Sequence, residues 1–311
     1  DAQLIEFIAF DPEQNFPSPS FVRQIENQNL HALNIPELTI ITPAALQTEA
    51  ERVAQLHREE GLTVAVIEQE KIFNEFSSGT PDASAYRRLM KMFYDRAEGN
   101  ENVRPRYLLL FGDGSYNNRK SMEKLHSPEC NMLLTYQSKT SIDERESFVI
   151  EDYFGFLEDN SGEEIKVDKV CLGIGRFPIS SIKNARLVVD KLYRYVHDKD
   201  FSSWKNNICI AADDGDGAIH AEQADKGSDT LLLKNTSQPR LGFRVNKIYI
   251  DSYYMDPQTI KYPEANRELM KQFNEGMLVF NYIGHNDPEV GFTGEGLFSR
   301  YEMDHLTNTR L

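Results

Sequence analysis

Short apolar segments that alternate with segments of helical periodicity most constrain the fold of this chain. The apolar segments are "ELTII", "LTVAVIEQ", "RYLLLFGDGS", "DKVCLGIGRFP", "NNICIAADDGDG", "RVNKIYIDSYY" and "MLVFNYIGH". Strands that are apolar throughout and separated by helices are typical of a parallel sheet covered on both faces. We therefore predict an α/β protein with mainly parallel sheets flanked by helices.

The segments between these strands predict helices. After "ELTII", Thr42 and Pro43 suit an N-cap and a first helical residue, and Gly61 suits the helix end. Apolar residues at helical spacing predict further helices near 85–93, from 181 to 195, and over 218–234, 264–273 and 298–306. We interpret "EDYFGFLEDNSGEE" as a strand end followed by an acidic turn.

The chain length of 311 residues suggests two domains. A strand and linker over residues 1–30 lead into a first α/β subdomain, residues 31–200. The polar stretch "HDKDFSSW" separates it from a second α/β subdomain, residues 201–311. Both ends of the chain resemble the interior of a protein, so we expect a piece of a longer polypeptide.

Composition excludes several classes of protein. With 40% hydrophobic residues the chain is not disordered, and a net charge of −15 argues against nucleic acid as a partner. No apolar run approaches the ~20 residues of a transmembrane helix. Three cysteines make no disulfide framework. We expect Cys171 and Cys209 to be small buried residues, while Cys130, in a loop near His126, is a weak candidate for a Cys-His pair.

Ionisable residues follow two predicted strands of the second subdomain. Asp213, Asp214 and Asp216 come after "CIAA", and His285 comes after "LVFNYI". The carboxyl ends of parallel strands lie at one edge of a sheet, where ligands gather. A carboxylate beside an imidazole is the base half of a serine or cysteine nucleophile system. The alternative is a loop histidine near a solvated acidic turn.

Other motifs give weaker signals. "DDGDGAIHAE" is not an EF-hand, because Ala218 stands where an oxygen ligand is needed, and His220 and Glu222 face apart on a helix. "FGDGS" and "GIGRF" lack the residues of a nucleotide-binding loop, which leaves nucleotide binding a weak alternative. Four acidic residues at predicted strand ends of the first subdomain could converge on a hard cation or be solvated turn residues: Asp113, Asp152, Glu158 and Asp159.

Several motifs together resemble the gingipain-type cysteine peptidases. They are "RYLLLFGDGSYNNR", "EDYFGFLEDNSGEE", "LGIGRFPISSIKNARLVVDKLYRY", "ICIAADDGDGAIHAEQAD" and "LVFNYIGHNDPEVGF", in the family's order. "SSGTPDASAYRRLMKMFYDRA" is similar to the sortase-like branch of that family, which belongs to the type IX secretion system. The resemblance implies two α/β subdomains, the second caspase-like and here incomplete at its C-terminus.

The resemblance also implies the roles of single residues. His285 occupies the place of the catalytic histidine, and Asp214, with Asp213 as its close competitor, that of the acid, which is a glutamate in gingipains. The backbone N–H of Asn286 would help form the oxyanion hole, although Asn286-Asp287 replaces the usual small residue. The nucleophilic cysteine is expected beyond Leu311, so the fragment alone should be inactive.

The function implied by this resemblance is that of a sortase. It would remove C-terminal sorting domains from secreted proteins and pass the acyl group to water or to anionic lipopolysaccharide. Its partners would include other type IX secretion components, at the outer-membrane surface or in the periplasm before export. No cofactor is required, and a structural calcium ion at the acidic strand ends is the one metal implied. The alternative is an inactive, gingipain-like scaffold or binding module of a secretion complex.

Overall fold

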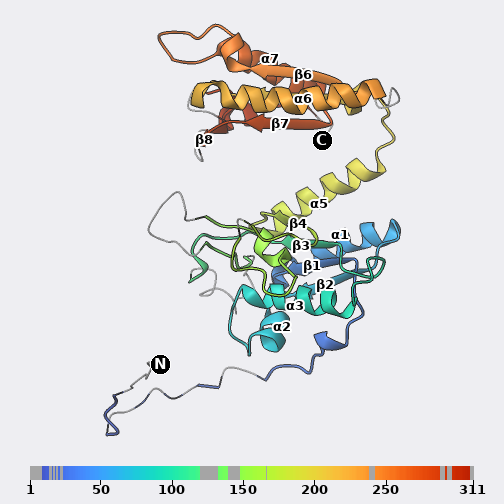
Figure 1. Cartoon of the computed structure of the whole chain (residues 1–311), viewed down its shortest axis with the longest axis vertical. Coiled ribbons are helices and arrows are strands. Elements are labelled where there is room, and N and C mark those ends of the chain that lie inside the picture. Colours follow the sequence, from blue (N-terminus) through green and yellow to red (C-terminus); the bar gives the residue numbers. More distant parts are fainter. Residues whose placement is uncertain are drawn as a thin grey trace. The chain divides into compact units, whose positions relative to one another are not determined.

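The chain forms two compact α/β units, each with its own parallel sheet (Figure 1). The computed structural model describes residues 9–13, 16, 18, 20–21, 24–119, 132–138, 148–165, 167–237, 242–287, 291–292 and 296–308. The units are Asp1–Val189 and Asp190–Leu311, and each is described by itself below. Most of the strand expected within residues 1–10 lies outside the described residues.

The sheet of the first unit has four parallel strands in the order β2-β1-β3-β4. They are β1 (Leu38–Thr42), β2 (Val64–Glu68), β3 (Tyr107–Phe111) and β4 (Gly173–Phe177). Every residue of the central strand β1 is buried, as expected for a strand with helices on both faces. The apolar runs thus predict the positions of these strands correctly.

Helix α1 (Gln47–Glu59) lies between β1 and β2. Helices α2 (Gln69–Phe76) and α3 (Ser84–Arg96) both lie between β2 and β3. Helices α2 and α3 lie side by side and share a core with the sheet through Phe73, Tyr86 and Phe93. Helix α1 stops before Gly61, which has a φ of 96°, as predicted for a residue after a helix end.

Three details of the first unit differ from the sequence-based expectations. Thr42 does not cap α1, because a 3₁₀ turn (Ala44–Leu46) comes first and the Thr42 hydroxyl donates to main-chain carbonyls. The 3₁₀ turn Asp152–Gly155 replaces the strand end expected in "EDYFGFLEDNSGEE". Its aromatic residues are buried, and a short buried run alone does not distinguish a turn from a strand. Helix α2 was not predicted.

The carboxylate of Glu75, at the end of α2, binds the segment that leads into the first unit. It accepts hydrogen bonds from the backbone N–H of Leu30 at 2.7 Å, the side chain of Gln28 at 2.8 Å and Nδ1 of His31 at 2.7 Å. Burial would raise the pKa of Glu75, but these bonds outweigh it and lower the pKa below its usual value. The residues around Leu30 are therefore fixed to the domain.

The sheet of the second unit has three parallel strands in the order β6-β5-β7. They are β5 (Asn207–Ala212), β6 (Arg244–Tyr249) and β7 (Val279–Ile283). Alternate residues of β5 face opposite sides: Ile208 and Ile210 pack with α6 (Ile219–Ser237), whereas Cys209 and Ala211 pack with α7 (Pro263–Glu275). The sheet is covered on both faces, as predicted.

Short elements complete the second unit. Strands β8 (Asn286–Asp287) and β9 (Gly291–Phe292) form a small antiparallel pair directly after β7. Helix α8 (Arg300–Asp304) begins with a capping box between Ser299 and Glu302, which satisfies the N–H groups of its first turn. The last predicted helix is thus present.

The division between the units falls within helix α5 (Ile182–His197). The sequence places the boundary after residue 200, at the polar stretch, whereas the compact units divide between Val189 and Asp190. The first half of α5 buries Ala185 and Val189, and later apolar residues such as Val196 are exposed. The loss of burial therefore occurs inside the helix and precedes the polar stretch.

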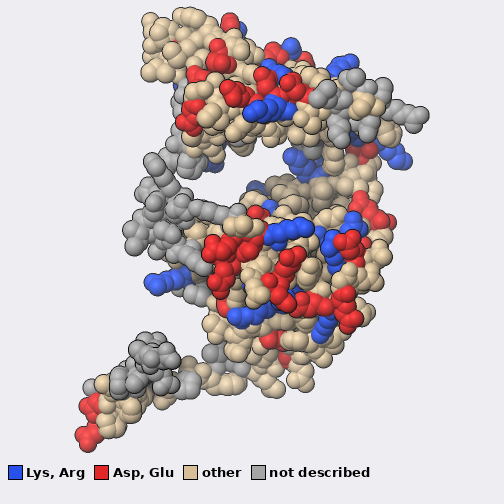
Figure 2. Space-filling model, in the orientation of Figure 1, with Lys and Arg blue, Asp and Glu red and all other residues tan. Residues whose placement is uncertain are grey.

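The surface carries charges of both signs. Figure 2 shows acidic and basic side chains interspersed over the visible face of the first unit. Among the described residues, every helix is too short or too polar to cross a bilayer. The exclusion of nucleic acid rests on the net charge of −15 and stays a prediction.

Glu75→Gln should destabilise the first unit by about 1.5–3 kcal/mol at pH 7, the usual worth of hydrogen bonds to a charged group. Because folding lowers the pKa of Glu75, its contribution is complete above the unfolded pKa of about 4.3 and is lost as pH falls through the lower folded value. Thermal unfolding at pH 7 and pH 3 measures both effects. Glu26→Gln, at an exposed position in the same segment, is the control. An equal loss of stability at both pH values would contradict the prediction.

Candidate active site

The ends of β5 and β7 and the start of α6 come together at one edge of the second sheet. Ala212 of β5 pairs with Ile283 of β7, so the residues that follow each strand are neighbours. The backbone N–H of Asp213 continues the pairing by donating to the carbonyl of Ile283 at 3.3 Å. The prediction that His285 and the aspartates after β5 meet at this edge therefore agrees with the structure.

Asp213 is the buried centre of this edge, with 4% of its surface exposed. Its Oδ2 accepts a hydrogen bond from the backbone N–H of His285 at 2.7 Å, and its Oδ1 accepts one from the N–H of Gly215 at 3.2 Å. Oδ1 also binds Nδ1 of His220, and the Tyr282 hydroxyl lies 3.2 Å from Oδ2. One carboxylate thus joins β5, β7 and α6.

These bonds keep Asp213 ionised despite its burial. Burial on its own would raise the pKa of Asp213, because it disfavours the charged form. The hydrogen bonds from the His285 N–H, the His220 ring and the Gly215 N–H act in the opposite direction, and the pKa lies below its ordinary value. A buried negative charge therefore stands next to two histidines.

Gly284 is required by the close approach of β7 to Asp213. A Cβ at residue 284 would lie 2.5 Å from Oδ2 of Asp213, well inside van der Waals contact. A larger residue would push the His285 backbone away from the carboxylate. The glycine before the histidine is therefore part of the arrangement that fixes the backbone of His285.

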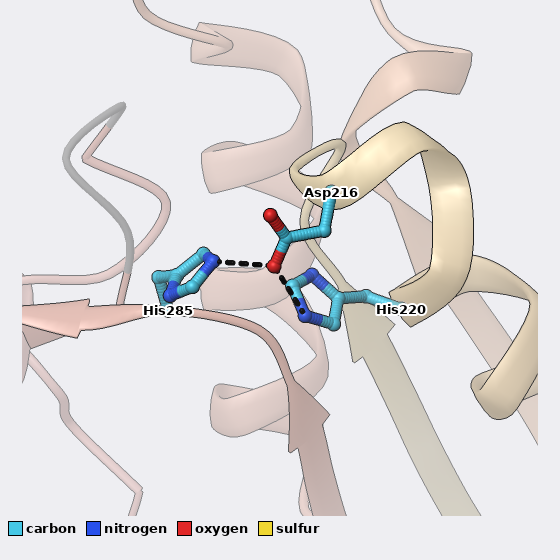
Figure 3. A group of neighbouring side chains, drawn as sticks. All are labelled: Asp216, His220 and His285. Atoms are coloured by element: carbon cyan, nitrogen blue, oxygen red, sulfur yellow. Dashed lines mark hydrogen bonds and ion pairs between the residues drawn. The ribbon is translucent and has the colours of Figure 1, made fainter. Parts of the chain in front are cut away.

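The ring of His285 pairs with Asp216 (Figure 3). Its Nε2 lies 2.9 Å from Oδ2 of Asp216, and the side chain is 69% exposed. A carboxylate only accepts, so this contact places a proton on Nε2 and leaves the lone pair on Nδ1. His285 is thus an exposed imidazole with one ring nitrogen held by an acid and the other able to accept a proton.

The two aspartates predicted to orient His285 have other partners in this structure. Oδ2 of Asp214 accepts from the hydroxyl of Tyr262 at 2.5 Å, and Asp213 binds the backbone of His285. The reason is local geometry, since the chain turns sharply after Asp213 and brings Asp216 to the ring instead. Asn286, whose N–H is predicted to bind an oxyanion, begins β8 opposite Phe292.

His220 is a part of the site that sequence reasoning missed, and Asp216, which the sequence places at this edge, was not predicted as the partner of the His285 ring. The spacing of His220 and Glu222 excludes only that pair as ligands on one helix face. Asp216 lies four residues before His220 but precedes α6 in a left-handed turn, so helical spacing does not predict their contact. In the structure His220 Nε2 lies 3.6 Å from Oδ2 of Asp216, and Figure 3 shows the two histidines on either side of that carboxylate.

Cys209, the described cysteine of the second unit, contributes no reactive group to this edge. Cys209 is buried in β5, and burial raises the pKa of its thiol to about 12, so it stays protonated. Cys171, which is partly exposed, belongs to the first unit, and Cys130 lies outside the described residues.

The four residues proposed for calcium are not brought together. Among the described residues, the ligand atoms that approach as a group of three or more are those of Asp216, His220 and His285. Asp159 instead binds Nζ of Lys91 at 2.8 Å, and Asp113 accepts from the N–H of Gly114. Neither Asp152 nor Glu158 completes a ligand group with them in the described part of the chain. Calcium binding stays a prediction.

Gly284→Ala should lower the free energy of unfolding of the second unit by about 1–3 kcal/mol, the usual cost of overpacking. Gly227→Ala is the matched control, because Gly227 lies within α6 and an added Cβ would have no neighbour within 4 Å. That variant should be more stable by about 0.8–1 kcal/mol, since alanine is the better helix former. Thermal unfolding of both variants measures the difference. A stabilising effect at residue 284 would show that the approach to Asp213 is not tight.

Comparison with known proteins identifies the family. The family model of peptidase family C25 matches residues 31–311. The structure of dimeric latent PorU from Porphyromonas gingivalis is similar with 44% identity and a TM-score of 0.52, over 58% of this chain and 17% of that chain. No curated protein sequence matches the chain significantly.

Two gingipain structures share the fold over most of the chain. The Arg-specific cysteine proteinase gingipain R (RgpB) has 17% identity and a TM-score of 0.57, over 91% of this chain and 54% of that chain. A complex of the pro- and mature domains of RgpB from Porphyromonas gingivalis has 20% identity and a TM-score of 0.55, over 88% of this chain and 53% of that one.

This chain therefore spans less than two thirds of each of these relatives. The likeness confirms the predicted α/β fold with a caspase-like second subdomain. The chain belongs to peptidase family C25, the gingipain family of cysteine peptidases.

Proposed function

We propose that the parent protein is a cysteine endopeptidase with transpeptidase activity and that His285 is its general base. The observation that carries the proposal is the placement of His285. Its backbone is fixed by a buried carboxylate, its ring is paired with a second carboxylate, and its side chain is exposed at the carboxyl edge of the sheet. Such an arrangement is the base half of a nucleophile system.

The proposed chemistry follows from the free Nδ1 of His285. Nδ1 takes the proton of a cysteine thiol as the sulfur attacks a peptide carbonyl carbon. Backbone N–H groups, with that of Asn286 as the candidate, stabilise the resulting oxyanion. The C–N bond then breaks, and the imidazolium gives its proton to the leaving amine. Water or an amine finally attacks the thioester, restores the thiol and releases the acyl group.

The nucleophile is proposed to lie beyond Leu311. The resemblance to the gingipain family implies a cysteine after the catalytic histidine. Cys130, Cys171 and Cys209 all precede His285, and the buried, protonated thiol of Cys209 is unsuited to attack. The 311 residues alone are therefore proposed to be inactive.

The acid that acts on the ring of His285 is proposed to be Asp216. The 2.9 Å contact between Oδ2 and Nε2 supports this assignment. The resemblance instead points to Asp214, with Asp213 as its competitor. Asp214 accepts from Tyr262, and Asp213 fixes the His285 backbone, so both support the same edge indirectly.

The substrates are proposed to be secreted proteins that carry C-terminal sorting domains. The 44% identity to PorU over 58% of the chain supports a sortase of the type IX secretion system. The acyl group would pass to water or to anionic lipopolysaccharide at the outer-membrane surface, with other secretion components as partners.

A scaffold without catalytic activity is the second candidate. The substitution of Asn286-Asp287 for the small residue expected after the histidine favours it, because Asp287 adds negative charge where an oxyanion must form. The encoded residue at the end of the strand beyond Leu311 separates the two candidates. A cysteine there supports the peptidase, and any other residue supports the scaffold.

Labelling of the full-length protein with a thiol-reactive peptide probe tests the role of His285. His285→Ala should slow labelling by about 10²-fold or more, the usual contribution of a general base. His57→Ala is the control, because His57 pairs with Glu60 on α1 of the first unit. Equal rates for the wild-type protein and His285→Ala would remove His285 from the mechanism.

The acid is identified by comparing Asp216→Asn and Asp214→Asn in the full-length protein. We expect Asp216→Asn to lower kcat/KM at least about 10-fold more than Asp214→Asn, because only the first change removes the carboxylate that fixes the ring tautomer. Peptide hydrolysis rates measure this, with circular dichroism as the check on folding. The reverse order would assign the role to Asp214.

A further inference from the structure

We propose that Asp216, His220 and His285 form a binding site for a divalent transition-metal ion of the zinc type, and that metal binding there switches off the base. One possible ligand atom of each residue lies within 4.8 Å of those of the other two, and Oδ2 of Asp216 is close to Nε2 of both histidines. The binding stands on geometry alone. Only its inhibitory consequence rests on the proposed function.

The distances suit a tetrahedral ion with little movement. Zinc ligands at 2.0–2.1 Å from the metal are about 3.3 Å from each other in a tetrahedron. In the structure Oδ2 of Asp216 lies 2.9 Å from Nε2 of His285 and 3.6 Å from Nε2 of His220, on either side of that value. The imidazole rings are 5.2 Å apart and nearly perpendicular, at 79°, so both can direct a nitrogen at one point beside Asp216 (Figure 3).

The donor set selects the class of ion. Two imidazoles and one carboxylate suit zinc and its neighbours, whereas calcium and magnesium prefer oxygen ligands throughout. Three protein ligands also leave one coordination position open, as in zinc sites that bind water or substrate. Since the side chains of His285 and Asp216 are 69% and 57% exposed, an ion can reach the site from solvent.

His220 already makes the kind of contact that orients a metal-binding histidine. Its Nδ1 binds Oδ1 of Asp213, which is buried. The carboxylate accepts from Nδ1, so in the neutral His220 ring the lone pair of Nε2 is the one available to a metal ion. A carboxylate, a histidine and a metal in series fix the ring and strengthen its donor nitrogen. This contact is present before any metal binds.

The backbone that carries Asp216 is unusual. Asp216, Gly217 and Ala218 have φ values of 53°, 66° and 71°, so three successive residues have left-handed conformations. Such conformations are unfavourable for a residue with a side chain and often mark functional sites. Here they reverse the chain between β5 and α6 and place the Asp216 carboxylate between the two histidines.

Metal binding changes the tautomer of His285. A neutral imidazole that binds a metal through Nε2 carries its proton on Nδ1. That is the nitrogen that the proposed mechanism needs free to take the thiol proton. An ion at this site therefore occupies one nitrogen of His285 and blocks the other, and it also displaces the hydrogen bond from Asp216. The same three residues would act as a base when the ion is absent and as a metal site when it is present.

The test is a titration of the 311-residue chain, without a polyhistidine tag, with Co²⁺ followed by its visible absorption and with Zn²⁺ in competition. We expect one ion per chain, with absorption bands of four- or five-coordinate cobalt that zinc abolishes. His220→Ala should weaken binding at least about 10-fold, and Asp213→Asn about 10–100-fold through the lost contact with Nδ1 of His220. His57→Ala, which removes a surface histidine paired with Glu60, should leave binding unchanged.

Circular dichroism of each variant distinguishes loss of the site from loss of the fold, and Asp216→Asn serves as a second variant should His220→Ala not fold. Folded His220→Ala or Asp216→Asn with the affinity of the unchanged chain would overturn the proposal. So would a loss of affinity in His57→Ala as large as that in His220→Ala. Because no nucleophile takes part in this binding, failure here leaves the proposed peptidase intact, and failure of probe labelling leaves the metal site intact.

Discussion

The second unit depends on one buried carboxylate. Asp213 directly follows the central strand β5, and its two oxygens together bind the backbone of His285, the N–H of Gly215 and the ring of His220. An ionised group at 4% exposure is tolerated only when its hydrogen bonds replace those of water. The charge therefore fixes three chain segments at once. His285 keeps its position because Asp213 binds its backbone N–H, and Gly284 leaves the space for this approach.

The regular part of the fold could be predicted because burial on both faces produces long apolar runs. Every strand of the two parallel sheets coincides with such a run. Gly61 follows the end of α1 and Pro263 starts α7, which are positions that favour glycine and proline. Helix α2 was missed since it starts directly after β2 with no intervening turn. The turn at 152–155 was misread because aromatic residues buried in a 3₁₀ turn look like a strand end.

The sequence predicts which residues of the site share a sheet edge, but not which of them are in contact. Periodicity indicates that Asp213, Asp214, Asp216 and His285 share an edge, because each follows a parallel strand. Periodicity does not indicate which carboxylate faces the His285 ring, because it predicts side-chain directions only within strands and helices. The three left-handed residues after Gly215 belong to neither, and their conformation turns Asp216 towards His285. His220 was set aside for the same reason: its partner precedes the helix, and the second histidine is 65 residues away in sequence.

The strand order β6-β5-β7 has a further consequence. Among the described residues, β7 is an outer strand, and its residue Val279 is 44% exposed, whereas the corresponding positions of β5 are buried. The outer side of an edge strand presents amide and carbonyl groups that can accept another strand. A segment added there in parallel would finish level with Ile283, one or two residues from the imidazole. A side chain at the end of that segment would lie near the His285 ring without a long loop, because strand pairing would set the distance between them.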